Sequence, residues 1–248
     1  MDEIVRRAVA RAIVTMQDNL GERLTIDDMA RSAMFSKFHF SRVFNQVTGL
    51  SPGRFLSALR LAEAKRLLVS TSTSVTDISH QVGYNSVGTF SARFSSSVGV
   101  PPSSYRQLRG RTPRVPEQRE CARSGAGVRG QLRCPPATDV GMVFLGLFPG
   151  RITEGTPARH TFLTGAGPYH LQDVPVGRWY VLAHAWGACR LEDGGPRPYV
   201  GVAGPVTIHE GVAASLADVR LRPRRGFDPP ALLALPDLRR VVPQPLAV

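Results

Sequence analysis

A repeat at an offset of about fifty residues limits what this chain can fold into more than any other feature of the sequence. Residues 36–55 read SKFHFSRVFNQVTGLSPGRF, and the same frame returns fifty positions later, so that Phe40 and Gly49 correspond to Phe90 and Gly99. Upstream of this stretch the offset is forty-nine, which leaves one extra residue in the second copy. A repeat of this length with helical periodicity indicates one supersecondary unit that is used twice.

Each copy is predicted to contain two short helices joined by a tight turn. In the first copy Thr25 is a good N-cap, and Asp28 stands where a capping-box partner is expected. A turn over 33–35 follows. Ser36 is then predicted to cap a second helix, which ends at Gly49.

The second helix of the first copy has an apolar face and a polar, basic face. Phe40, Val43 and Phe44 share the apolar face by their i, i+3, i+4 spacing. Two short helices around a tight turn, with a basic outward face on the second, are typical of a helix-turn-helix whose second helix enters the major groove. A helical hairpin in an ordinary bundle is the alternative, and two copies with the same turn and cap chemistry favour DNA binding. The outward-facing residues are Lys37, Phe38, Ser41, Arg42 and Asn45.

A continuous helix from Pro52 to about Val69 is predicted between the two copies. At about 1.5 Å per residue, its roughly eighteen residues give a rod of about 27 Å. Two helices that read one face of a duplex lie about 34 Å apart. The length therefore permits the two second helices to enter successive major grooves. A further helix over residues 2–20 is predicted to be scaffold.

Positive charge is concentrated in the repeat and in the segment that follows it. The formal net charge is +12. Residues 1–106 hold 13 basic and 8 acidic residues, residues 107–137 hold 7 and 2, and residues 138–222 hold 7 and 7. This distribution fits phosphate neutralisation by one half of the chain. The positive charge alone would also be enough for a protein that binds DNA with low specificity. A low-specificity DNA-binding or nucleoid-associated scaffold protein is therefore the alternative function.

No motif in the sequence points to an enzyme, a metal site or a cofactor. The sequence lacks a Gly-rich phosphate loop, a G-x-S-x-G elbow and an H-E-x-x-H pair, and the separation of His184 from Cys189 is poor support for a base and its nucleophile. No apolar run is long enough to span a bilayer, and the first residues do not read as a signal peptide. Three scattered cysteines argue against a disulfide framework. The expected location is the cytoplasm, without membrane association.

Residues 107–137 are predicted to be an Arg/Gly/Pro-rich flexible linker, because they lack periodicity and carry seven arginines. A solvated tether is the default interpretation. Insertion of Arg109-Gly110-Arg111 into an A·T-rich minor groove is the alternative. Residues 223–248 are predicted to be a C-terminal tail, in which ALLAL docks one turn of helix on the preceding domain.

Residues 138–222 are predicted to form an all-β antiparallel sandwich that senses a ligand or mediates dimerisation. Short apolar or alternating runs recur here between Gly and Pro residues. Several side chains are candidates for a small-molecule pocket, but strand alternation places Trp179 and Tyr180 on opposite faces, so they cannot all line one cavity. Core and surface aromatics of a plain sandwich are the alternative, and the ligand-binding residues stay unassigned. The pocket candidates are Tyr169, His170, Trp179, Tyr180, His184 and Trp186. The predicted strands cover 140–148, 159–163, 169–174, 178–185, 199–202, 206–208 and 214–221.

Residues 1–106 resemble the DNA-binding domain of the AraC/XylS family. The motifs that carry the resemblance are R-x-F…G-x-S-P, R-L-x-x-A and V-G-Y…F…F…V-G-x-P-P-x-x-Y-R, in this order. The resemblance implies an all-α domain with two helix-turn-helix motifs. It also implies a sequence-specific bacterial transcription regulator, commonly an activator, that inserts both recognition helices into adjacent major grooves. The implied partners are double-stranded DNA and RNA polymerase.

Carried over position by position, the resemblance implies that Phe38, Ser41 and Arg42 read bases from the first recognition helix. Lys37 would lie at the phosphate edge, and Asn45 lies one turn further along the same face. The chemistry agrees, because arginine bonds bidentately to guanine O6 and N7 and phenylalanine packs on a thymine methyl group. A phosphate clamp is the alternative role for Arg42.

The second recognition helix departs from the family pattern. Ala92 stands where the family often has a basic residue, and neither Gly88 nor Ser91 beside it can make a bidentate charged contact. We therefore predict that this helix mainly docks on phosphates and that base specificity is concentrated in the first motif. The predicted docking residues are Asn85, Ser86, Thr89 and Arg93, with Val87 on a methyl group.

Residues 138–222 resemble the transthyretin-like, carboxypeptidase-regulatory type of sandwich, through the stretch GPYHLQDVPVGRWYVLAHA. In many AraC/XylS members the sensing domain precedes the DNA-binding domain, whereas here the order is inverted. This departure weakens any transfer of sugar sensing to this chain. A small-molecule effector and a homodimer both stay open as roles for this domain.

Overall fold

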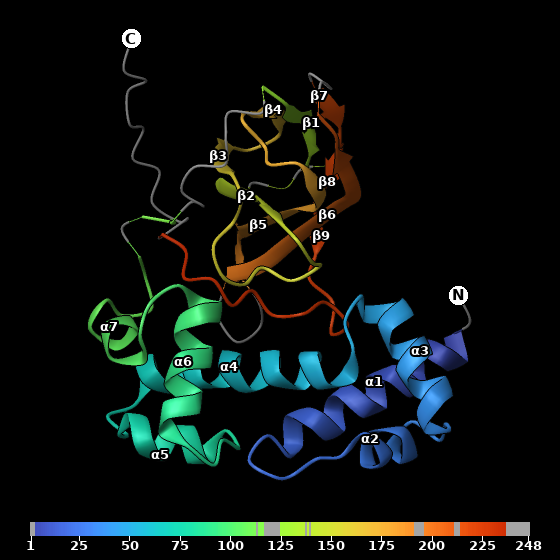
Figure 1. Ribbon diagram of the computed structural model, residues 1–248, viewed down its shortest axis with the longest axis vertical. Coiled ribbons are helices and arrows are strands. Elements are labelled where there is room, and N and C mark those ends of the chain that lie inside the picture. Colours follow the sequence, from blue (N-terminus) through green and yellow to red (C-terminus); the bar gives the residue numbers. More distant parts are fainter. Residues whose placement is uncertain are drawn as a thin grey trace. The chain divides into compact units, whose positions relative to one another are not determined.

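The computed structural model describes residues 3–112, 114–116, 125–136, 138, 140–190, 196–210 and 214–236 (Figure 1). It divides into two compact units. The first, called here the helical unit, combines Met1–Thr112 with two short segments from the other half of the chain, Arg151–Gly155 and Arg225–Ala234. The second, the sheet unit, contains Pro113–Gly150, Thr156–Arg224 and Leu235–Val248. This division differs from the predicted one, in which each domain was a continuous stretch of chain.

The helical unit contains both predicted helix-turn-helix motifs. The first motif is the pair α2 and α3, the second is the pair α5 and α6, and α4 runs between them (Figure 1). The helices are α1 (Glu3–Asp18), α2 (Ile26–Ser32), α3 (Lys37–Thr48), α4 (Pro52–Ser70), α5 (Val75–Gln81), α6 (Val87–Val98) and α7 (Pro102–Gln107).

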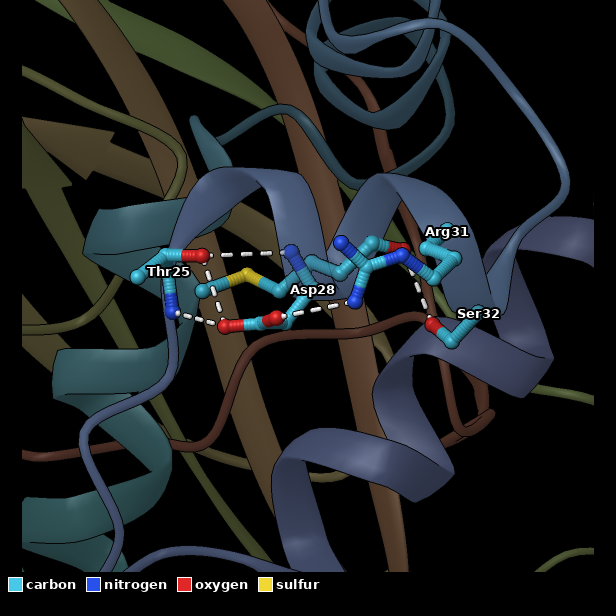
Figure 2. Close-up of polar contacts among 5 residues, drawn as sticks. Thr25, Asp28, Arg31 and Ser32 are labelled. Carbon is cyan, nitrogen blue, oxygen red and sulfur yellow. Dashed lines mark hydrogen bonds and ion pairs between the residues drawn. The ribbon is translucent and has the colours of Figure 1, made fainter.

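A capping box begins α2, as the sequence predicted (Figure 2). The Thr25 Oγ accepts the Asp28 amide at 3.2 Å, and the Asp28 carboxylate accepts the Thr25 amide at 3.0 Å. The hydrogen bonds from Thr25, and then the guanidinium of Arg31, hold the pKa of Asp28 below its usual value. The box satisfies amide groups that would otherwise lack a partner at the start of this short helix.

The turn inside each motif has the same backbone conformation in both copies. Met34 and Gly83, which correspond in the repeat, both adopt a positive φ, 58° and 83°. In the first copy the Phe35 amide donates to the Ala30 carbonyl at 3.0 Å, and the equivalent bond in the second copy measures 2.9 Å. This is a Schellman-type helix end, which favours glycine at the left-handed position. The second copy has one more residue before its second helix, as the offsets predicted.

Aromatic side chains form an equivalent core in each motif. In the first, the rings of Phe40 and Phe44 lie 5.3 Å apart, and the latter contacts Phe55 at 5.4 Å. In the second, the corresponding Phe90, Phe94 and Tyr105 are separated by 5.6 Å at each step. The predicted apolar faces of α3 and α6 are therefore the faces that pack inward. The same core includes side chains from the two added segments: Ile152, Leu232 and Ala234.

The sheet unit contains two sheets that contribute side chains to one core. One sheet has the order β4-β1-β7, with β8 also pairing with β1, and the other has the order β3-β2-β5-β6-β9. The strands are β1 (Gly127–Arg133), β2 (Met142–Phe148), β3 (His160–Thr164), β4 (Gly167–Leu171), β5 (Gly177–Arg190), β6 (Pro196–Ile208), β7 (Ala214–Leu216), β8 (Val219–Arg220) and β9 (Arg222–Pro223).

Several sequence predictions are wrong in this part of the chain. The strand β1 lies inside the predicted linker, and it pairs in parallel with β7 and β8, so its sheet is not purely antiparallel. The two strands predicted over 199–202 and 206–208 are one strand, β6. The ALLAL stretch is irregular rather than helical, and the segment Arg225–Ala234 belongs to the helical unit.

The alternation in β1 explains why the sequence concealed it. Val128 and Leu132 point into the core, whereas Arg129, Gln131 and Arg133 are exposed on the other face. Two glycines and two arginines in seven residues gave this strand the composition of a linker, although burial alternates along it from Val128 to Arg133.

No helix of the described residues is long and apolar enough to cross a membrane.

Candidate nucleic-acid interface

The first turn of α3 exposes a large apolar side chain beside a lysine. Phe38 is 86% exposed, although Phe40 and Phe44 in the same helix are fully buried. The Nζ of Lys37 lies 3.7 Å from a carboxylate oxygen of Asp27, and both side chains are half exposed or more. An exposed pair of this kind contributes little to stability, so the ammonium can exchange its partner for a phosphate.

Arg42 and Ser41 occupy the next turn of the same exposed face. The Arg42 guanidinium lies 3.3 Å from the Nδ1 of His39, and no acidic side chain of the described residues forms an ion pair with it. The hydroxyl of Ser41 donates to the Lys37 carbonyl at 2.9 Å, which leaves its oxygen able to accept. Asn45 is exposed on the following turn. The five predicted residues of α3 therefore lie on one solvent-facing side.

The start of α6 is also exposed, but its side chains are small or neutral. Ser86 is the N-cap, and its Oγ accepts the Thr89 amide at 3.4 Å, whereas Ser36 at the start of α3 makes no side-chain cap bond. Ser36 is therefore the N-cap residue, as predicted, but its side chain does not bond to the helix amides. Asn85 and Val87 are exposed beside Ser86.

Arg93 lies differently from the other predicted residues of α6. It corresponds in the repeat to Val43, which is buried in the core of the first motif. Its guanidinium lies 3.6 Å from the carboxylate of Glu154, and its side chain is 41% exposed. Glu154 could not be predicted from the sequence, because no local pattern connects it with a helix more than fifty residues away.

Neither recognition helix contains an aspartate or a glutamate (KFHFSRVFNQVT and VGTFSARFSSSV). Each is twelve residues long and ends at a glycine in the left-handed conformation, Gly49 or Gly99. The positive end of each helix dipole and its free amide groups lie at the exposed N-terminus. These features make both N-termini compatible with an anionic partner.

The sheet unit has a hollow of about 680 Å³ on the sheet that contains β1. Of the six predicted pocket residues, only Tyr169 and His170 line it, and the other four lie on β5 in the other sheet. Among the described residues, no group of three or more His, Cys, Asp or Glu side chains is placed to hold a metal ion. The residues that line the hollow are Arg129, Gly130, Gln131, Pro168, Tyr169, His170, Ala214, Leu216 and Asp218.

Comparison with known proteins gives matches to the part of the chain that carries this interface. A family model described as a helix-turn-helix domain matches residues 29–108. The HTH-type transcriptional activator AarP of Providencia stuartii is 33% identical over 98 residues, which are 40% of this chain and 73% of AarP. The lactose operon transcription activator of Staphylococcus xylosus is 33% identical over 104 residues, 42% of this chain and 37% of that protein.

A solved structure of a transcriptional regulator from Chromobacterium violaceum, described as having an AraC-type DNA-binding domain, is 30% identical to this chain. The match covers 42% of this chain and 93% of that one, with a TM-score of 0.41. The similarity to AarP extends over nearly three quarters of that activator's length. The chain therefore belongs to the helix-turn-helix family of DNA-binding transcription regulators that includes AarP.

Proposed function

We propose that this chain activates transcription by placing α3 and α6 in successive major grooves of a bacterial promoter. The observation that carries the proposal is that both helices expose their N-terminal turns after the same left-handed turn, while their aromatic faces pack inward. The nineteen-residue α4 between the motifs is about 28 Å long at 1.5 Å per residue. That length is close to the roughly 34 Å between successive grooves on one side of a duplex.

Base recognition is assigned mainly to α3. Arg42 bonds to guanine O6 and N7, Phe38 packs on a thymine methyl group, and Ser41 lies between them on the same face. Lys37 neutralises a phosphate, and Asn45 extends the polar surface along the groove.

The second helix is assigned a docking role. Asn85, Ser86 and Thr89 bind phosphate oxygens at its N-terminus, and Val87 contacts a methyl group. Arg93 is not assigned to a phosphate, because its guanidinium is paired with the carboxylate of Glu154. Base specificity should therefore lie mainly in the half-site that α3 occupies.

The sheet unit is assigned the role of a sensing or dimerising domain of the transthyretin-like sandwich type. Two sheets around one core support this assignment, although β1 makes one of them a mixed sheet. The hollow over β1 is the candidate site for a small-molecule effector, with Arg129 and His170 at its edge. RNA polymerase is the proposed partner at the promoter, and this role places the protein in the cytoplasm.

Selection of bound duplexes from a random pool, followed by a scan of each base pair, tests the proposal. We expect two half-sites whose centres lie about one helical turn apart, with most of the sequence information in one of them. Loss of the sequence information at one base pair of that half-site in the Arg42→Ala variant would assign the half-site to α3. Equal information in both half-sites would refute the division of roles between α3 and α6.

A further inference from the structure

Glu154 contacts two arginines that belong to different parts of the helical unit. Its Oε1 lies 2.5 Å from the Nη2 of Arg54, in the first turns of α4, and its Oε2 lies 3.6 Å from the Nη2 of Arg93, on α6. The Ser97 hydroxyl, near the end of α6, donates to the same Oε2 at 3.2 Å. The Glu154 side chain is 17% exposed. One carboxylate therefore joins the helix that leaves the first motif to the recognition helix of the second.

The segment around Glu154 is fixed by hydrogen bonds to the same region. The Gly155 amide donates to the Ser97 carbonyl at 2.8 Å. Ile152 and Thr153 are buried. The Thr153 carbonyl accepts the amide of Leu232 at 2.8 Å, which connects this segment to Arg225–Ala234. The position of the carboxylate is thus set by main-chain contacts and not only by its own ion pairs.

The segment Arg225–Ala234 is itself bonded to the helices. The Ala234 amide donates to the Val98 carbonyl, at the end of α6, at 2.9 Å. The Nζ of Lys65, in the second half of α4, donates to the carbonyls of Ala231 and Leu232 at 3.0 and 2.7 Å. The two added segments therefore connect α4 to the end of α6 through residues outside both motifs.

We infer that Glu154 is a positioning residue for DNA recognition, which sets the distance between α3 and α6. Along the chain from Met1 to Thr112, α4 is the connection between the first and second motifs. Glu154, which lies outside Met1–Thr112, adds a second connection between the two motifs. Removing its charge would leave Arg54 and Arg93 facing each other without a counter-ion, so like charges would push α6 away from the start of α4. The inference rests on the proposed function, because the separation matters only if both helices bind one duplex.

The same contacts have a second interpretation, in which Glu154 withholds the two arginines from phosphates. Its consequences differ from those of positioning. A competitor for phosphate lowers the affinity for every duplex, and its removal raises the salt dependence of binding, because more cations then meet phosphates. A positioning residue instead changes how strongly the protein distinguishes duplexes of different half-site spacing.

The separation of the helices can be measured without DNA. Spin labels would be placed at Gln46→Cys on α3 and Ala92→Cys on α6, both exposed positions, and the distribution of label distances compared between the full-length protein and its Glu154→Gln variant. We expect a broader or shifted distribution in the variant. An unchanged distribution would overturn the inference. Glu63→Gln is the matched control, because it breaks an ion pair with Arg66 inside α4 alone. The native cysteines would first be replaced by serine at Cys121, Cys134 and Cys189.

The spacing preference can be measured on a duplex selected by the wild-type protein, with one base pair inserted between the half-sites. We expect the insertion to reduce wild-type affinity about tenfold or more, comparable to a mismatched base pair. The Glu154→Gln variant should lose about threefold or less on the same duplex. An equal loss in both proteins, or a uniform gain in affinity with a steeper salt dependence, would contradict positioning.

Two further controls keep the outcomes distinct. If Glu154→Gln does not fold, Arg93→Gln removes one arm of the cluster and should broaden the label distances in the same direction. If the wild-type protein selects no sequence, the proposed function fails, while the label distances still decide whether Glu154 positions α6.

Discussion

Arg42 is the side chain on which base selectivity should depend most. It is exposed in the middle of α3, and its guanidinium lies beside the imidazole of His39. We expect Arg42→Ala to reduce the affinity for a selected duplex by about 1–3 kcal/mol and to relax selectivity at one base pair. Binding titrations against the selected duplex and its single-base variants measure both effects. A loss that is the same for every base at every position would instead assign Arg42 to a phosphate.

Lys37→Ala provides the comparison on the same helix. The Lys37 ammonium is a flexible point charge beside Asp27, suited to a phosphate rather than to a base edge. We expect the variant to bind all sequences more weakly by the same factor. The slope of log affinity against log salt concentration should fall by about one. A sequence-dependent loss would contradict the phosphate role.

Met34 has a backbone conformation that its side chain disfavours. Its φ of 58° lies in the left-handed region, where the second copy has a glycine, and its side chain is 77% exposed. We expect Met34→Gly to raise the free energy of unfolding by about 0.5–1 kcal/mol, because glycine adopts this conformation without the steric cost of a Cβ atom. Chemical denaturation measures the change. Met34→Ala is the control, since it removes the exposed side chain and keeps the Cβ; a gain as large in Met34→Ala would contradict the backbone explanation.

At the scale of elements, the attachment of the Arg225–Ala234 segment to α4 should depend on pH. Burial lowers the pKa of Lys65 to about 7, whereas a lysine in an unfolded chain titrates near 10.4. Between these values the unfolded state binds a proton that the folded state does not, so the free energy of unfolding should rise as the pH increases from about 7 to 9.

The Lys65→Met variant isolates this contribution. The variant should lose at most about 1.4 kcal/mol of that rise per pH unit, because one titrating group supplies no more. Denaturation of both proteins at pH 7, 8 and 9 gives the difference between their free energies of unfolding. The contribution of Cys134, whose pKa is raised by burial, is common to both proteins and cancels. Parallel curves for the two proteins would show that Lys65 keeps an ordinary pKa in the folded state.

The elements differ in how far the sequence predicts them. Caps, glycine helix ends and aromatic spacing are local signals, so the bounds of α2 to α6 could be predicted within a few residues. The strand β1 could not be predicted, because its two apolar side chains, Val128 and Leu132, stand among arginines and glycines. The docking of Arg151–Gly155 depends on contacts across a hundred residues, such as Arg54 to Glu154, for which a single sequence carries no signal.

The same difference applies to the candidate interface. Exposure of Phe38 and Arg42 followed from the position of the buried phenylalanines in the same helix. The contact of Arg93 with Glu154 did not follow from the sequence of the helix. The repeat gave one indication of it, because the equivalent residue of the first copy is the buried Val43. A polar residue aligned with a core position is a reason to search for a partner elsewhere in the chain.

At the scale of the whole molecule, the charge distribution and the duplicated motif make different predictions. The net charge of +12 by itself would bind any duplex. Two exposed recognition helices at a fixed separation would instead favour one arrangement of bases. A regulator and a nucleoid-associated scaffold therefore differ in the ratio of specific to non-specific affinity.

That ratio is the most direct test of sequence-specific recognition by the duplicated motif. It would be measured with full-length protein at one fixed salt concentration, on a duplex selected from a random pool and on a random duplex of equal length. We expect the selected duplex to bind at least about 10³-fold more tightly. A ratio near one would mean that charge alone accounts for binding, and would contradict the assignment of α3 and α6 as readers of sequence.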